Sequence, residues 1–319
     1  MTEKKAPPRG QPEGVAEKAA QAKELLNRVH KDIAAVLKPD RFVRFLDTLE
    51  RFHWFSYVNI LLIMEQFPAA EYLAGYDVWK KTSLSMYNDP ERKILTAENH
   101  KKAIRLVAPF TVLDGSTRSL INVVVPAYDI KQTNGLPRPE NDFLDLSKCS
   151  CMDIVNAIGF VAPYRTTYAA SEDPRLSYNT KGYCNHETQQ FVVDSRLSVK
   201  GLLSVLLHEY AVASLHLSNY KNTELQSLVE ESVYYVLAKH FMLPVEDITF
   251  SYVVRLKDAP VKSIAEALYL IQMLSHIIIE KIEEHLEYLA ALSPITEDIY
   301  QANFFDDLEF GSDVMPDEI

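Results

Sequence analysis

Residues 202 to 216 read Leu-Leu-Ser-Val-Leu-Leu-His-Glu-Tyr-Ala-Val-Ala-Ser-Leu-His. This apolar run, preceded by Ser198 as a helix N-cap, predicts a long helix from Val199 to about Leu217. The dipeptide His208-Glu209 lies in the middle of that helix. In zinc peptidases, two histidines four residues apart on one helix bind the metal, and the glutamate after the first histidine activates water. This predicted helix is therefore the first candidate for a functional site.

The second histidine of that pattern is absent. Residues four apart are neighbours on one helical face, so the partner of His208 should be residue 212, which is Val212. His216 lies on nearly the same face, but eight residues along the helix, which is roughly 12 Å of axial rise. Two nitrogens bound to one zinc at about 2.0–2.1 Å cannot be that far apart. The sequence thus predicts a zinc-peptidase-like helix with an incomplete metal site.

The next predicted helix, from Asn222 to Phe241, offers a further metal ligand. Glu230 and Glu231 both lie in it. Glu231 precedes a small residue and an apolar face, where its carboxylate would point back at His208, so we prefer Glu231 to Glu230. The alternative interpretation is that His208 is a buried histidine on a core helix, without a metal.

Apolar periodicity predicts the remaining elements. Pro39 is expected to end the first helix. Two hairpins are expected, the first with Asp114-Gly115-Ser116 between its strands. The sequence predicts helices over 14–37, 41–52, 57–66, 152–159 and 264–289, and hairpins over 103–125 and 182–193. Helices dominate and the sheets are small, so the predicted fold class is α+β and mainly helical.

The 319 residues are enough for two domains. Residues 132–141 contain two prolines and are typical of a linker. We expect a disordered leader over 1–13, an N-terminal domain over 14–140, a second domain over 141–295 and an acidic tail over 296–319.

Acidic residues are concentrated near the C-terminus. The chain has 44 acidic and 33 basic residues, with a net charge of −11, and twelve of the acidic residues but only one lysine lie between Glu280 and Ile319. Residues 1–279 therefore contain 32 acidic and 32 basic residues. This distribution argues against a general duplex-DNA binder but leaves room for a local basic groove. Because no signal peptide or membrane-spanning run is visible, we expect a cytoplasmic protein with no membrane partner.

Several segments together resemble the ArdC/LtrC-like proteins of plasmids and conjugative elements. The segments that carry this resemblance are Lys181-Gly182-Tyr183, His208-Glu209-Tyr210-Ala211, Leu215-His216, Phe55-Ser56-Tyr57-Val58-Asn59, Trp79 and 128–133. These proteins have an N-terminal single-stranded-DNA-binding domain and a C-terminal zincin-like metallopeptidase domain related to the ImmA/IrrE peptidases. Their active-site helix typically reads His-Glu-Tyr-Ala-His-Ala-Leu-Leu-His, which this chain matches except at Val212 and Ser214.

The resemblance implies roles for individual residues. His208 and Glu231 would be zinc ligands, and Glu209 would be the general base. For the aromatic residues of the first half, the alternative is burial in the core, as for Trp54, Phe55 and Trp79. The N-terminal domain of the family implies contacts to single-stranded DNA, by base stacking or phosphate binding, from Tyr57, Asn59, Trp79, Lys101 and Lys102.

We therefore expect a mobile-element-associated protein of the antirestriction type with a degenerate peptidase domain. With Val212 in place of a ligand, zinc would bind weakly or not at all. The chain would then be a pseudoenzyme that binds single-stranded DNA or a protein partner. The alternative is an active zinc metallopeptidase of the ImmA/IrrE type that works with fewer protein ligands.

Overall fold

The computed structural model describes residues 14–96, 98–114, 117–139, 144–169, 173–177, 180–256 and 258–306. The predicted leader over 1–13, the turn residues 115–116 and residues 307–319 of the predicted acidic tail lie outside them. The described residues form a mainly helical α+β fold with two small sheets, so the predicted fold class is confirmed.

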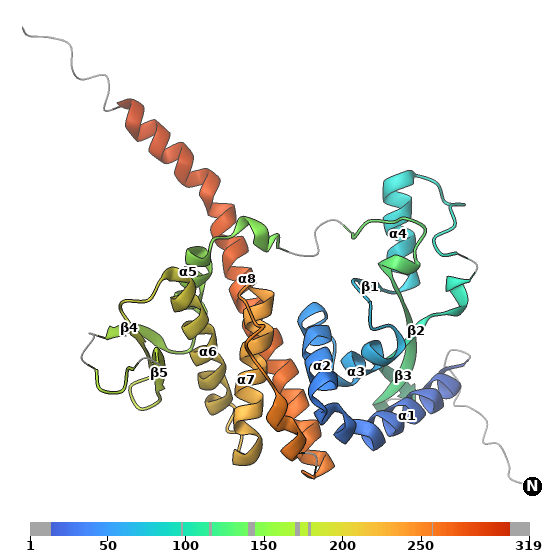
Figure 1. The fold of residues 1–319 in the computed structure, drawn as a ribbon. Coiled ribbons are helices and arrows are strands. Elements are labelled where there is room, and N and C mark those ends of the chain that lie inside the picture. The colour runs from blue at the N-terminus through green and yellow to red at the C-terminus, as the bar shows by residue number, and fades with distance from the viewer. Residues whose placement is uncertain are drawn as a thin grey trace, which may run out of the picture.

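Helices make up most of the described chain (Figure 1). They are α1 (Val15–Asp32), α2 (Pro39–Arg51), α3 (Tyr57–Gln66), α4 (Tyr76–Tyr87), α5 (Cys151–Val161), α6 (Val199–Leu217), α7 (Thr223–His240) and α8 (Val261–Asp306). The strands are β1 (Leu73–Ala74), β2 (Ile104–Asp114), β3 (Thr117–Asp129), β4 (Arg165–Ala169), β5 (Gly182–Asn185) and β6 (Gln190–Asp194).

The first part of α8 lies in the middle of the molecule, and its C-terminal part projects beyond the body (Figure 1). Helices α5, α6 and α7 and the strands β4, β5 and β6 lie on one side of it, and α1 to α3 with the other sheet lie on the opposite side. By length and composition alone, its segment Val261–Ala291 could cross a membrane, but 56% of the most apolar window is buried within the protein. A buried core helix passes the same test of length and composition, so this is weak evidence for a membrane span.

One hydrophobic core continues across the two predicted domains. Its buried members come from α1 to α3 as well as from α5 to α8. The ring of Phe42 in α2 packs edge-on against Phe250, with centroids 5.2 Å apart. Beside it, the Tyr235 hydroxyl of α7 donates to Asp47 of α2 at 2.9 Å. The boundary near residue 140 stays a prediction, since the core itself does not divide there.

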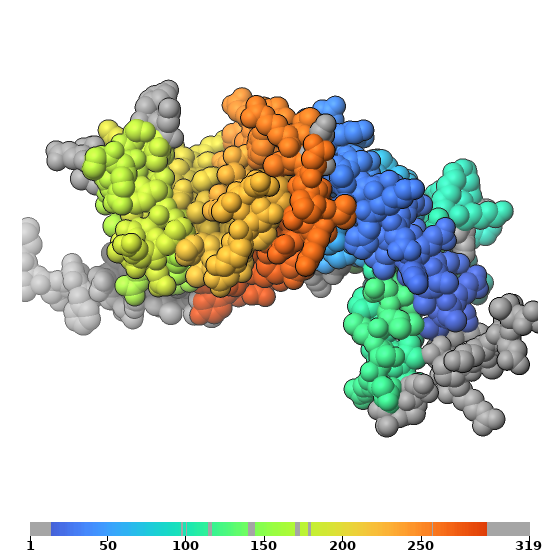
Figure 2. Space-filling model, turned by 90° about the horizontal axis from the view of Figure 1, so that it is seen from below, coloured from blue at the N-terminus to red at the C-terminus, as the bar shows by residue number. Residues whose placement is uncertain are grey.

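The two sheets have different topologies. The first has the order β1-β3-β2 and is antiparallel throughout, and Figure 2 shows its β2–β3 hairpin projecting from the body beside α1. The second has the order β4-β6-β5, with β4 parallel and β5 antiparallel to β6. Strand β4 was not predicted, because Arg-Thr-Thr-Tyr-Ala has no apolar alternation.

Some predicted boundaries are wrong. The first helix ends at Asp32 and continues to Leu37 as a 3₁₀ helix. Pro39 does more than end a helix, because it occupies the first turn of α2, where its missing N–H costs no hydrogen bond. Helix α8 extends from 261 to 306, beyond the predicted 264–289 and into the predicted tail.

A glycine allows the second sheet to approach α6. A Cβ built on Gly182 of β5 would lie 2.4 Å from Cγ1 of Val205 and 3.1 Å from the carbonyl oxygen of Val192. Valine on a helix has one strongly preferred χ1 rotamer, so its methyl cannot simply turn away. The glycine of the Lys181-Gly182-Tyr183 motif therefore fixes the distance between β5 and α6.

We expect Gly182→Ala to destabilise the protein by about 1–3 kcal/mol, since a methyl group is forced into a packed contact. Urea unfolding followed by circular dichroism would measure this change. Gly159→Ala is the matched control, because nothing lies within 4 Å of a Cβ at that position in α5. That variant should be neutral or more stable by about 0.5–1 kcal/mol. Equal stability of the two variants would contradict the close approach.

Candidate functional site

Helix α6 places His208 and Glu209 between the second sheet and α7. Ser198 caps the helix by accepting from the backbone N–H of Gly201 at 3.2 Å, as its sequence predicts. Nδ1 of His208 lies 3.0 Å from Oε1 of Glu209, whose residue is only 6% exposed. The His208 ring packs edge-on against Tyr234 of α7, with centroids 5.4 Å apart. The two predicted residues therefore lie together, with the Glu209 side chain buried and that of His208 42% exposed.

Carboxylates surround His208. Burial lowers the pKa of His208, but the charges of Glu209, Glu230 and Glu231, together with the hydrogen bond to Glu209, outweigh burial and raise it above its ordinary value of 6.5. The protonated imidazolium is thus the form that this environment stabilises.

An open pocket of about 420 Å³ borders the same residues. It lies between β5, α6 and α7, next to the close approach at Gly182. Its lining residues are Thr180, Lys181, Gly182, Ser204, Val205, His208, Glu209 and Tyr234. The arrangement is an open pocket beside a His-Glu pair.

The predicted zinc ligands do not form a complete set. Oε2 of Glu231 accepts from the Tyr252 hydroxyl at 2.8 Å, and Glu230 accepts from a neighbouring glutamine side chain on its own helix. In the part of the chain that the structure describes, His208, Glu209 and Glu231 do not bring three ligand atoms within 4.8 Å of one another. With Val212 offering no lone pair, these residues do not fit a catalytic zinc ion, which needs three protein ligands and a water.

His216 does not replace the missing ligand. Its ring stacks on that of His186, from the β5–β6 turn, with centroids 3.8 Å apart and planes 15° from parallel. The Tyr164 hydroxyl lies 3.1 Å from Nδ1 of His186. His216 is therefore held against this turn, away from the pocket beside His208.

Two of the residues predicted to contact DNA have structural roles. Trp79 is 0% exposed, and its indole N–H donates to the carbonyl oxygen of Tyr128 at 3.0 Å. Asn59 is 7% exposed, and its amide donates to and accepts from the backbone of Val107 at 2.9 and 2.8 Å. In this structure neither side chain offers a face to a base. They hold the β2–β3 hairpin to α3 and α4.

Tyr57 is half-buried at the start of α3, where its ring packs against the hydrophobic core. Burial raises the pKa of its hydroxyl. Like Trp54 and Phe55, it is a partly buried neighbour of the core, as the alternative interpretation of these aromatic residues holds.

Lys101 and Lys102 are exposed and line a pocket of about 640 Å³, together with Phe67 and Arg105. Lys102 is also ion-paired with Glu98. Arg105 in addition lines a neighbouring pocket of about 340 Å³ on α1. We call the two pockets together the basic groove, and its cationic residues are Arg28, Lys31, Lys101, Lys102 and Arg105.

Sequence reasoning missed three residues of the basic groove. Arg28 and Lys31 lie three apart on the exposed face of α1, a spacing that helical periodicity could have revealed. Phe67 follows α3, and nothing in its sequence context distinguishes it from a core residue. The groove forms where α1 packs against the β2–β3 hairpin, which a local sequence pattern does not reveal.

No protein-family model matches this chain, and no curated protein matches it. The solved structures to which it is similar include two of the antirestriction protein ArdC from plasmid R388. The metal-free crystal structure aligns with a TM-score of 0.44 and 15% identity, and the Mn(II)-bound one with 0.44 and 14%. Each alignment covers 82% of this chain and 97% of the other. At this sequence identity and TM-score, the comparison supports no conclusion about the site, which is argued from the residues of this chain alone.

We expect the pKa of His208 in the metal-free protein to lie above 6.5, and to fall when Glu209 is replaced by Gln. Because the pKa of His208 is higher in the folded than in the unfolded protein, His208 stabilises the fold fully at pH values below its unfolded-state pKa. This stabilisation is lost as the pH rises through its folded-state pKa. NMR titration of the imidazole signals would measure both pKa values. Glu224→Gln, on the first turn of α7, should leave the titration unchanged, whereas a parent value below 6.5 would contradict the assignment.

Proposed function

We propose that this protein is a single-stranded-DNA-binding pseudoenzyme with a zincin-like but catalytically incomplete C-terminal half. The observation that supports DNA binding most directly is the basic groove, where Lys101, Lys102 and Arg105 line one pocket with Phe67, and Arg28, Lys31 and Arg105 line the neighbouring one. Cations that follow a phosphate backbone, next to an aromatic ring on which bases stack, are the usual means of binding single strands. The resemblance to ArdC/LtrC-like proteins points to the same ligand and to an antirestriction role in a mobile element.

The polar side chains of the groove favour binding without sequence preference. The amide of Gln66 donates to and accepts from the backbone of Arg105, both at 3.0 Å. The amide of Gln132 donates to the carbonyl oxygen of Lys102 at 2.8 Å and accepts from the backbone of Asp129. Because these amides are occupied in holding the groove walls, they cannot read base edges. The interactions left for binding DNA are phosphate–cation attraction and base stacking, and neither distinguishes the bases strongly.

The C-terminal half then serves a binding role. The His208–Glu209 pair and the pocket beside it keep the outline of a peptidase site, while Val212 removes a ligand and Tyr252 holds the carboxylate of Glu231. Two ligands would hold zinc only weakly, so we do not propose that this protein hydrolyses peptides. A protein partner in this pocket is the second candidate ligand, and the protein would act in the cytoplasm.

We expect the parent protein to shift single-stranded oligonucleotides in a mobility assay at low salt, and Lys101→Glu/Lys102→Glu to weaken binding by roughly tenfold or more. Loss of two phosphate contacts should also lower the slope of log affinity against log salt by about 1.4, at about 0.7 per contact for single strands.

The matched control for this assay is Lys262→Glu/Lys281→Glu, which makes the same charge change on exposed lysines of α8. It should bind like the parent. If both double variants lose binding equally, net charge rather than the groove is responsible. An absence of any shift by the parent at low salt would overturn the proposal of DNA binding.

We expect Val212→His to hold one more equivalent of zinc than the parent, because a histidine at this position restores the second ligand on the His208 face. Elemental analysis of both proteins after dialysis would measure this difference. Val212→Ala, which adds no ligand, is the control. Equal zinc content in the parent and Val212→His would show that residue 212 does not face the metal position, and the zincin interpretation would be wrong.

A further inference from the structure

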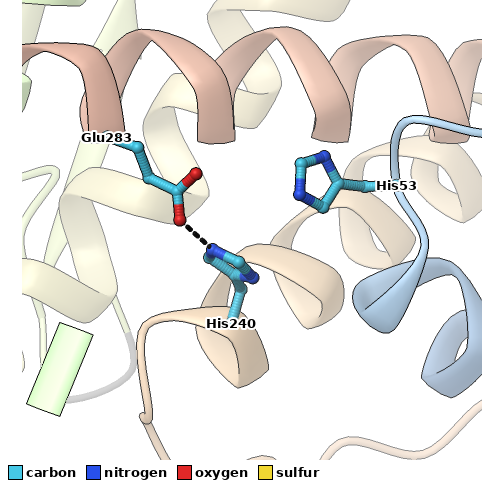
Figure 3. A group of neighbouring side chains, drawn as sticks. All are labelled: His53, His240 and Glu283. Atoms are coloured by element: carbon cyan, nitrogen blue, oxygen red, sulfur yellow. Dashed lines mark hydrogen bonds and ion pairs between the residues drawn. The ribbon is translucent and has the colours of Figure 1, made fainter. Parts of the chain in front are cut away.

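A second group of metal-ligating side chains lies far from the pocket beside His208. His53 from the loop after α2, His240 at the end of α7 and Glu283 of α8 converge at one point (Figure 3). Each of the three offers one ligand atom, and these atoms all lie within 4.8 Å of one another. Nε2 of His240 and Oε1 of Glu283 are already 2.9 Å apart. No sequence motif connects the three, which come together only through the shared core.

Both histidines have an outer partner on the nitrogen that does not face the centre of this group. Nδ1 of His53 lies 3.1 Å from Nδ1 of His276, and Figure 3 shows the other ring nitrogen of His53 facing His240 and Glu283. Nδ1 of His240 lies 3.6 Å from Glu50, while its Nε2 faces Glu283. Metal-bound histidines are characteristically held in this way, by a hydrogen-bonding group on the nitrogen away from the metal.

The surroundings also suit an ion. His53 is 5% exposed, and the side chains of His240 and Glu283 are 13% and 17% exposed, so a bound ion would be largely removed from solvent. The same three residues line a pocket of about 210 Å³, which could supply a water ligand. Two imidazoles, one carboxylate and one water form a set that zinc accepts, at about 2.0–2.2 Å from each ligand.

We propose that His53, His240 and Glu283 bind a zinc-class divalent transition-metal ion, with Glu50 and His276 positioning the two imidazoles. Such an ion would connect α2, α7 and α8, and its fourth position would face the pocket. This site is independent of the proposed DNA-binding role and of the incomplete set around His208.

Zinc titration of the chelator-treated full chain by calorimetry tests the proposal. We expect about one zinc per chain and a higher melting temperature with zinc, since an ion that binds only the folded state stabilises it. Glu283→Gln, which keeps the shape of the side chain, and His53→Ala should each weaken binding by more than about 100-fold. Glu50→Gln should weaken it by about 10–100-fold, the usual effect of losing an outer partner.

Two controls assign the ion to this site. His208→Ala should bind zinc like the parent, and His30→Ala, on the exposed face of α1, should do the same. Circular dichroism of the zinc-free variants establishes whether they are folded. If His53→Ala is not folded, the test depends on Glu283→Gln, which keeps the shape of the side chain. A parent that binds no zinc, or zinc lost in His208→Ala but kept in Glu283→Gln, would overturn the proposal.

Discussion

The structure depends on the burial of α8 between two groups of elements that are distant in sequence. Its apolar face packs against α5, α6 and α7 on one side and against α3 and the segment after α1 on the other. Each fully buried Leu or Ile contributes about 1.5–3 kcal/mol relative to exposure, so the buried Leu and Ile side chains of α8 stabilise the fold substantially. The polar contacts of Asp47 with Tyr235 and Lys239 then fix how α2 lies along α7.

Local patterns predicted the local structure well. Helices α3 and α6 have the bounds that apolar periodicity predicts, and α6 begins directly after Ser198, its predicted N-cap. Strand β4 escaped prediction because it is mostly exposed and pairs with β6 in parallel, a partner that local sequence does not reveal. The extent of α8 beyond residue 289 escaped prediction as well, because this stretch contains Pro294, a residue that usually signals the end of a helix.

The candidate sites show the same contrast between features that the local sequence predicts and features that only the packing of distant segments decides. The adjacency of His208 and Glu209 on α6 follows from a helix that the sequence predicts, so the pair could be found without a structure. Asn59 and Trp79 were assigned to DNA from sequence resemblance, whereas their hydrogen bonds tie α3 and α4 to the hairpin. The convergence of His53 with His240 and Glu283 depends on how three distant segments pack, and no spacing rule could have found it.

The continuous core has a consequence for the integrity of the chain. If the backbone were cut between residues 139 and 144, each fragment would keep half of a common interior and neither would have a complete one. The apolar surfaces that Phe42 and Phe250 now cover for each other would be left open to water. The two fragments should therefore stay associated as one noncovalent particle, in the manner of a split protein, and should aggregate when they are separated.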